Sequence, residues 1–366
     1  MKLRPLAEMA LQVKAGVPLP FGIRDASGQL LLAKGHVVSD AQELAVLMAR
    51  GATVEIEEAQ KRGEAVAPPA ENFPGRWHQL TVRAAVVLRP PVADDTLARV
   101  RELADQLIDM AERDADLLLY LALRSARDPG VQYGVLHVLH SAVICALLGR
   151  RAGWDAPTCH ALVCAALTMN LSIVELQSRL VGSTQPLTQA QRERIDSHVA
   201  DTLALLQQAG VDDPLWLRIV AEHHPPRPGA EEQPPPCEPA RLLRLVDAYA
   251  GRIAERPDTI IASPALAARD LFTQHGKDPL ALLLVKEMGV YPPGCHVRLV
   301  SGELAVVLRR GSSANAPLVA ALTNKRGDAL QTPSRRDTSI LPEHHIASVV
   351  PDKDVRVRFQ SQLLYK

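Results

Sequence analysis

The chain has 366 residues, enough for two or three domains of roughly 100–200 residues each. Its 41 basic and 41 acidic side chains cancel, so no global field steers it toward nucleic acid or an anionic membrane. We therefore expect no nucleic-acid partner. No run approaches the ~18 apolar residues of a membrane span, and the start lacks a signal-peptide core, so we expect no membrane span and a cytoplasmic location.

The first 60 residues predict a small α+β domain. Two short strands flank a glycine-containing turn, over residues 19–24 and 30–38, and a capped helix starts at Ser39 and continues to Met48. Residues 61–92 are rich in Glu, Ala and Pro, a composition typical of an extended linker rather than of a packed element.

Residues 93–290 predict a helical domain. Apolar residues recur at three and four positions from Asp94 to Ser125, and the helical pattern continues to about Met288. Prolines between Pro225 and Pro236 interrupt it, because no helix can continue through them. In residues 291–366 the apolar period changes to two, which predicts a β-rich unit. The fold class expected is thus mainly α.

Histidines in the helical segment form the most informative pattern. His137 and His140 lie three apart on one helix, His198 lies on a later helix, and His223-His224 ends the helix before the proline loop. Asp247 lies in an apolar helix, where an unpaired carboxylate would be costly to bury. Imidazoles with one carboxylate are ligands that Fe, Mn or Zn sites use. Together these residues indicate a metal site in the core of a helical bundle.

The sequence around these histidines resembles the bacterial HD-GYP family of phosphohydrolases over about residues 130–310. The matching segments are Tyr133 to His137 for the family's Tyr-x-x-x-His, Leu187-Thr188 before the helix of His198, Asp247 followed by Arg256-Pro257, and Tyr291-Pro292-Pro293-Gly294 with Gly302-Glu303. The resemblance implies a helical HD-type domain. The family's spacing selects His137 as its first ligand, which leaves His140 as a packing histidine.

The resemblance also implies a metal-bound hydroxide that attacks a phosphodiester of cyclic di-GMP, held at two or three metal ions. Met169-Asn170 stand where the family has its His-Asp pair, whose Asp bridges the metals. Ser172-Ile173 replace a Gly-Lys pair, and the Gly-Tyr-Pro loop is absent, leaving Arg227 as the cation that could meet a phosphate. We therefore expect the two-metal site to be degenerate and name no catalytic residue.

The surviving candidate ligands are His137, His198, His223, His224 and Asp247. The last three histidines could surround one divalent ion of Fe, Mn or Zn, as three-histidine sites do. The alternative is that the five groups bind no metal and are hydrogen-bonded to one another and to water, which keeps an inherited polar pocket satisfied.

Two functions remain open from the sequence. The first is a non-catalytic or weakly catalytic HD-GYP-like signalling module in bacterial cyclic di-GMP-related regulation, whose candidate partners are a signalling protein and a cyclic dinucleotide. The second is a metal-dependent phosphodiesterase that hydrolyses cyclic di-GMP with a reduced metal site. A plain structural scaffold has no positive sequence feature. The loss of metal bridge, phosphate lysine and loop together favours the first function.

Overall fold

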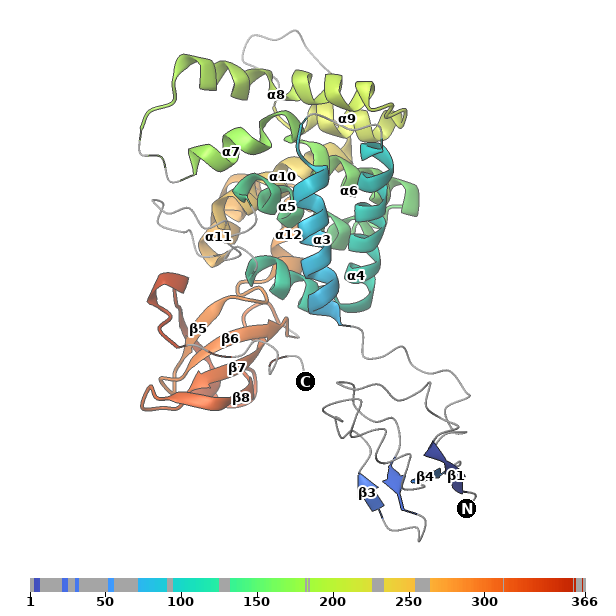
Figure 1. Cartoon of the computed structure of the whole chain (residues 1–366). Coiled ribbons are helices and arrows are strands. Elements are labelled where there is room, and N and C mark those ends of the chain that lie inside the picture. The colour runs from blue at the N-terminus through green and yellow to red at the C-terminus, as the bar shows by residue number, and fades with distance from the viewer. Residues whose placement is uncertain are drawn as a thin grey trace. The chain divides into compact units, whose positions relative to one another are not determined.

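The protein is described here from a computed structural model. It describes residues 3–6, 22–25, 30–32, 52–55, 72–90, 95–124, 132–181, 183, 185–225, 234–253, 264–311, 313–357, 359 and 364. The chain divides into two compact units, Met1–Asn72 and Phe73–Lys366. The fold is mainly helical, with strands near the N-terminus and an antiparallel sheet near the C-terminus (Figure 1).

The described part of the first unit is a small antiparallel sheet with the strand order β1-β4-β2-β3. Its strands are β1 (Leu3–Pro5), β2 (Ile23–Arg24), β3 (Leu30–Leu32) and β4 (Thr53–Glu55). The predicted pair of strands is confirmed, because β2 and β3 are antiparallel neighbours in the sheet, and the turn predicted between them lies outside the described residues. The helix predicted over residues 39–48 lies outside the described residues.

The second unit begins with helix α3 (Phe73–Val87), which corrects part of the predicted linker. Its buried side chains recur at helical spacing, and Trp77 and Leu80 are almost completely buried in the core. Burying a side chain of this size stabilises a fold by about 1.5–3 kcal/mol, which an extended linker could not gain. Prolines and alanines on both sides concealed this short amphipathic pattern in the sequence.

The helices from α4 onward confirm the predicted helical domain. Helix α4 is interrupted at Asp114, whose backbone is non-helical and whose carboxylate accepts a hydrogen bond from the Leu117 backbone N–H. This cap restarts the helix where the apolar spacing resumes. The bounds are α4 (Thr96–Arg124), α5 (Tyr133–Arg151), α6 (Ala156–Thr168), α7 (Val174–Leu180), α8 (Gln189–Gln208), α9 (Pro214–Glu222), α10 (Glu238–Ile253), α11 (Pro264–His275) and α12 (Pro279–Met288), with the 3-10 turn η3 (Leu171–Ile173).

Helices α5 and α6 form the centre of the hydrophobic core, and nearly all residues of α5 are buried. By length and composition the stretches Tyr133–Arg151 and Ala156–Leu180 could cross a membrane, which corrects the expectation that no run is apolar enough. In the fold, 89% and 83% of their most apolar windows are buried. A helix surrounded by other helices needs no polar face, which explains this composition.

The C-terminal segment confirms the predicted change to strands. It forms a five-stranded antiparallel sheet in the order β8-β7-β6-β5-β9. Alternate residues of β6 face opposite sides: Val306 and Leu308 join the helical core, whereas Ala305 and Val307 join a second cluster within the sheet unit. The strands are β5 (His296–Leu299), β6 (Leu304–Arg309), β7 (Leu318–Thr323), β8 (Ala329–Asp337) and β9 (Ile346–Val349). Figure 1 shows α8 and α9 on the side of the helices away from this sheet.

Candidate metal centre

Three histidines from two helices meet at one point. His198 is on α8, and His223 and His224 follow the last residue of α9. One potential ligand atom from each lies within 4.8 Å of the others. The ring centroids of His223 and His224 are 4.2 Å apart, and that of His198 lies 5.6 Å and 5.0 Å from them. We refer to His198, His223 and His224 as the three-histidine cluster.

Local sequence signals place these histidines. A reciprocal capping box between Thr188 and Gln191 fixes the start of α8, ten residues before His198. Helix α9 starts with Asp213 as its cap and Pro214 in its first turn. It ends before Pro225, since prolines cannot continue a helix. The carboxylate of Glu222 accepts a hydrogen bond of 2.7 Å from the Cys237 backbone N–H, which ties the end of α9 to the start of α10.

The hydrogen bonds of the two buried rings fix which nitrogen is free. The Nδ1–H of His198 donates to the Ile195 carbonyl at 2.6 Å, and that of His223 donates to the Val220 carbonyl at 2.7 Å. Both Nε2 atoms are buried and have no hydrogen-bond partner among the described residues. A ring that donates from Nδ1 presents a lone pair at Nε2, which is the usual arrangement of a metal-binding histidine.

The donor set fits a divalent transition metal ion. Bonds of about 2.0–2.1 Å place two nitrogens on a tetrahedral ion about 3.4 Å apart, so small side-chain movements would close the cluster around an ion. His224 is exposed to solvent, which provides an entry path. Three imidazole ligands would leave one position of a tetrahedral ion for water or another ligand.

Electrostatics keep these nitrogens unprotonated. Burial lowers the pKa of His223 to about 4, and the neighbouring charge of His224 contributes to this decrease. Desolvation where its ring meets the cluster also lowers the pKa of His224, although the residue is otherwise exposed. At neutral pH both rings therefore retain the lone pair that a metal ion requires.

His137 and Asp247 form a separate pair beside the cluster. His137 Nε2 lies 2.8 Å from Asp247 Oδ1, and the ring stacks on Tyr133 with a centroid distance of 5.9 Å. Burial alone would raise the pKa of Asp247, but the hydrogen bond and charge of His137, with smaller contributions from His223 and His224, lower it below its usual value. The pair joins α5 to α10, and it gives a hydrogen-bond partner to the Asp247 carboxylate, which would be costly to bury alone.

The segment with Met169 and Asn170 connects α6 to the three-histidine cluster. Met169 is fully buried in the hydrophobic core, and Asn170 is also buried, at the start of η3. Two residues later, the Ser172 hydroxyl donates to the His198 backbone carbonyl at 3.0 Å. The Thr202 hydroxyl in turn donates to Ser172 at 3.0 Å. This contact holds α8 against η3.

The structure divides the predicted ligands into two groups. His198, His223 and His224 share one ligand sphere, whereas His137 and Asp247 bind each other. His140 is buried on α5, and burial lowers its pKa to about 4. Arg227 and the Arg256-Pro257 segment lie outside the described residues. Sequence reasoning missed the contact of Ser172 with His198, because a serine in the sequence carries no signal of its tertiary partner.

Comparisons with known proteins add a distant similarity to solved structures. No protein-family model and no curated protein matches this chain. Among solved structures, Bd1817, an HDG"Y"P protein from Bdellovibrio bacteriovorus, is similar with a TM-score of 0.47 and 13% sequence identity. The similarity covers 77% of this chain and 96% of that chain. At this identity it does not align individual side chains, so the assignment of function has to rest on the side chains themselves.

Proposed function

We propose that this chain is an HD-GYP-like signalling module of bacterial cyclic di-GMP-related regulation that is non-catalytic or weakly catalytic and holds one divalent metal ion, Fe, Mn or Zn. The observation that carries the proposal is the contrast within the site. The three-histidine cluster presents two buried, unpartnered Nε2 atoms, whereas His137 and Asp247 are paired with each other at 2.8 Å.

The degeneracy of the two-metal site is part of this proposal. A second ion needs a bridging carboxylate, and at that place in the family resemblance the chain has Asn170, which carries no charge. Met169 is committed to the apolar core, and its thioether is a poor ligand for a hard or borderline ion. His137 directs its Nε2 to Asp247, and its Nδ1 is not among the grouped ligand atoms of the three-histidine cluster.

Individual residues of the chain have separate roles in this proposal. A divalent ion bound here would supply Lewis acidity and a water of lowered pKa. His198 and His223 would hold it, each fixed by the backbone carbonyl that accepts its Nδ1–H. Ser172 keeps the helix of His198 in place. The family resemblance places a lysine beside the substrate phosphate, and here Ile173 occupies that position.

The proposal includes a cytoplasmic location and two candidate partners, a signalling protein and a cyclic dinucleotide. A module that binds a partner needs a stable fold and an accessible binding surface, but it needs no catalytic turnover. The metal ion would then stabilise the junction of α8, α9 and α10, where the three-histidine cluster and Asp247 lie.

Elemental analysis and a turnover assay on the same sample test the proposal. The chain is purified without chelators, and its metal content is compared with that of His223→Ala and of the control variant His275→Ala, which changes an exposed histidine on α11. We expect one ion per chain, lost in His223→Ala and retained in His275→Ala, with little or no hydrolysis of cyclic di-GMP. Efficient hydrolysis that His223→Ala abolishes would reject the non-catalytic assignment.

The second candidate function is a metal-dependent phosphodiesterase that uses the single ion. The exposure of His224 favours it, because substrate could approach the ion from that side. Turnover that rises in proportion to bound metal would select this function. Turnover that remains at background after the site is fully loaded would reject it.

A further inference from the structure

A second site lies between the helices and the C-terminal sheet, at a cavity of about 350 Å³. Its walls come from the second half of α4, the end of α5, the end of α12 and the loop that follows β6. The side chains that matter here are Asp116, Arg151, Lys286, Glu287, Tyr291 and Arg310. Neither the three-histidine cluster nor the His137–Asp247 pair contributes to this cavity.

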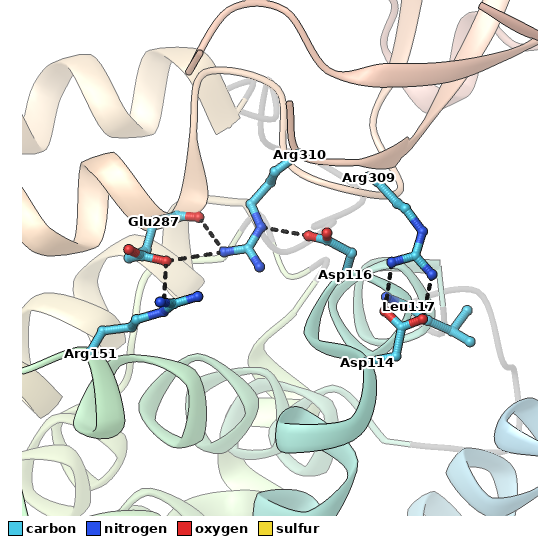
Figure 2. A network of polar contacts seen from close by, with 7 residues as sticks. All are labelled: Asp114, Asp116, Leu117, Arg151, Glu287, Arg309 and Arg310. Carbon is cyan, nitrogen blue, oxygen red and sulfur yellow. Dashed lines mark hydrogen bonds and ion pairs between the residues drawn. The ribbon is translucent and has the colours of Figure 1, made fainter. Parts of the chain in front are cut away.

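Arg310 forms ion pairs with both carboxylates of the cavity. Figure 2 shows it between Asp116 and Glu287. Its Nε lies 2.5 Å from Asp116 Oδ1, and its Nη1 donates to the Glu287 backbone carbonyl at 2.9 Å and lies 3.3 Å from the Glu287 carboxylate. All three side chains are at least four-fifths buried, so these pairs are weakly screened by solvent.

The described residues of the loop after β6 are restrained by several contacts. Arg309 binds both carboxylate oxygens of Asp114, the residue that interrupts α4 (Figure 2). A Cβ at Gly311 would lie 1.8 Å from the Ala316 carbonyl, so only glycine allows this close backbone approach. Gly289, with a φ of +70°, allows the opposite wall to turn so that the Val290 N–H donates to Ala314. The cavity is therefore preformed.

Two further cations line the cavity. Arg151 is 59% exposed and reaches Glu287 with Nε at 3.5 Å, so it shares that carboxylate with Arg310. Lys286 is exposed and has no ion pair among the described residues. Three cations, Arg151, Lys286 and Arg310, thus line the cavity with two carboxylates, Asp116 and Glu287, and 3 − 2 leaves a net charge of +1.

We propose that this cavity binds a small phosphate monoester. The volume is at the lower end of that of small-molecule sites, which is roughly 300–1,000 Å³. A phosphate monoester carries about −1.5 to −2 charges at neutral pH, so it gains more from the net positive charge of the cavity than a monoanionic carboxylate does, and Arg151 and Lys286 can approach it from two different helices. Arg151 supplies the planar guanidinium suited to phosphate oxygens, and the ring of Tyr291 offers a flat apolar wall for the body of the ligand.

Isothermal titration calorimetry with phenyl phosphate tests the proposal. Benzoate serves as the monoanionic probe and phenol as the uncharged one. The titrations use the full chain with His223→Ala, so that a metal ion at the three-histidine cluster does not bind the phosphate. We expect phenyl phosphate to bind more tightly than benzoate, and phenol not to bind at about 10 mM. The double variant Arg151→Gln with Lys286→Gln should bind phenyl phosphate at least about tenfold more weakly.

The matched control is Lys325→Gln with Arg326→Gln, which removes two exposed cations from the turn between β7 and β8. This control should retain the affinity for phenyl phosphate. Thermal unfolding should show that both double variants fold as the parent does, since all four side chains are exposed. An equal loss in both double variants, unchanged binding in Arg151→Gln with Lys286→Gln, or no binding by the parent would each overturn the proposal.

Discussion

The three-histidine cluster and the His137–Asp247 pair lie side by side but differ in how their polar atoms are satisfied. In the pair, His137 Nε2 and an Asp247 carboxylate oxygen meet at 2.8 Å, and His137 Nδ1 is buried without a hydrogen-bond partner among the described residues. In the cluster, His198 and His223 each donate from Nδ1 to the backbone and leave a buried Nε2 without a partner. The cluster brings potential ligand atoms of three histidines within 4.8 Å of one another, and His137 is not part of that group.

This difference supports the proposed metal ion over the alternative of internal hydrogen bonding alone. His137 and Asp247 are hydrogen-bonded to each other. In the cluster, two buried imidazole nitrogens have no partner among the described residues, and leaving them unsatisfied costs free energy. We therefore propose that the ion binds at the three-histidine cluster rather than at His137 and Asp247.

The largest expected effect separates the cluster from the pair by metal affinity. His223→Ala removes one of three ligands and should weaken Zn²⁺ or Co²⁺ binding by more than about 100-fold, since even supporting residues typically contribute about 10–100-fold. Competition against a chromophoric chelator measures the affinity. His275→Ala is the control and should leave it unchanged. Equal metal affinities in the two variants would show that the three-histidine cluster does not bind the ion.

The second effect concerns the stability of the metal-free chain. His137→Ala leaves the mostly buried carboxylate of Asp247 without its partner and should lower the free energy of unfolding by about 3 kcal/mol. The same variant should change metal affinity much less than His223→Ala does. Urea denaturation and the chelator assay measure the two quantities. A loss of metal affinity as large as that of His223→Ala would show that the two groups form one site.

The third effect is the pH dependence of the stability of the metal-free chain. His140 and His223 both have a folded pKa of about 4 because of burial, below the unfolded value of 6.5. The unfolded state therefore binds more protons between these values, and stability should fall as the pH decreases from about 6.5 to 4, by up to about 1.4 kcal/mol per pH unit and group. Urea midpoints of the metal-free chain at several pH values measure this.

The variant His140→Gln should reduce the slope of the unfolding free energy against pH by about the contribution of one histidine. It should not change metal affinity, because His140 lies outside the three-histidine cluster. A slope identical to that of the unmodified chain would contradict the assignment of His140 as a buried, neutral histidine.

The smallest effect tests the support of the cluster. Ser172→Ala removes the hydroxyl that donates to the His198 carbonyl and should cost about 1 kcal/mol, with a metal affinity several-fold weaker. Ser178→Ala is a matched control, because its hydroxyl donates to a backbone carbonyl on α7, away from His198. An equal change in metal affinity for both variants would mean that Ser172 has no specific role.

Local patterns predicted most of the fold. The apolar spacing from Asp94 to Met288 and the alternation after His296 gave the helices and the sheet, because both depend on neighbours in sequence. Helix α3 was missed, since its few apolar positions lie among alanines and prolines. The kink at Asp114 was not predicted, and the ion pair of Asp114 with Arg309 joins residues that are 195 positions apart.

The candidate site was predicted in part as an arrangement. The sequence singled out five candidate ligands, because histidines and a carboxylate in apolar helices require a reason to be buried, and the resemblance grouped His198, His223 and His224, which the structure brings together. The pairing of His137 with Asp247 could not be predicted, since the two residues are separated by 110 positions. The same holds for the cavity at Arg310, whose walls come from four separate segments.

The number of ions bound per chain tests the central claim most directly. The chain is saturated with Zn²⁺, freed of excess metal by dialysis, and its zinc content is measured by mass spectrometry alongside X-ray absorption at the zinc edge. We predict one ion per chain with three imidazole nitrogens as protein ligands. Two ions per chain would contradict the loss of the second site, and an absence of bound zinc would contradict the three-histidine centre.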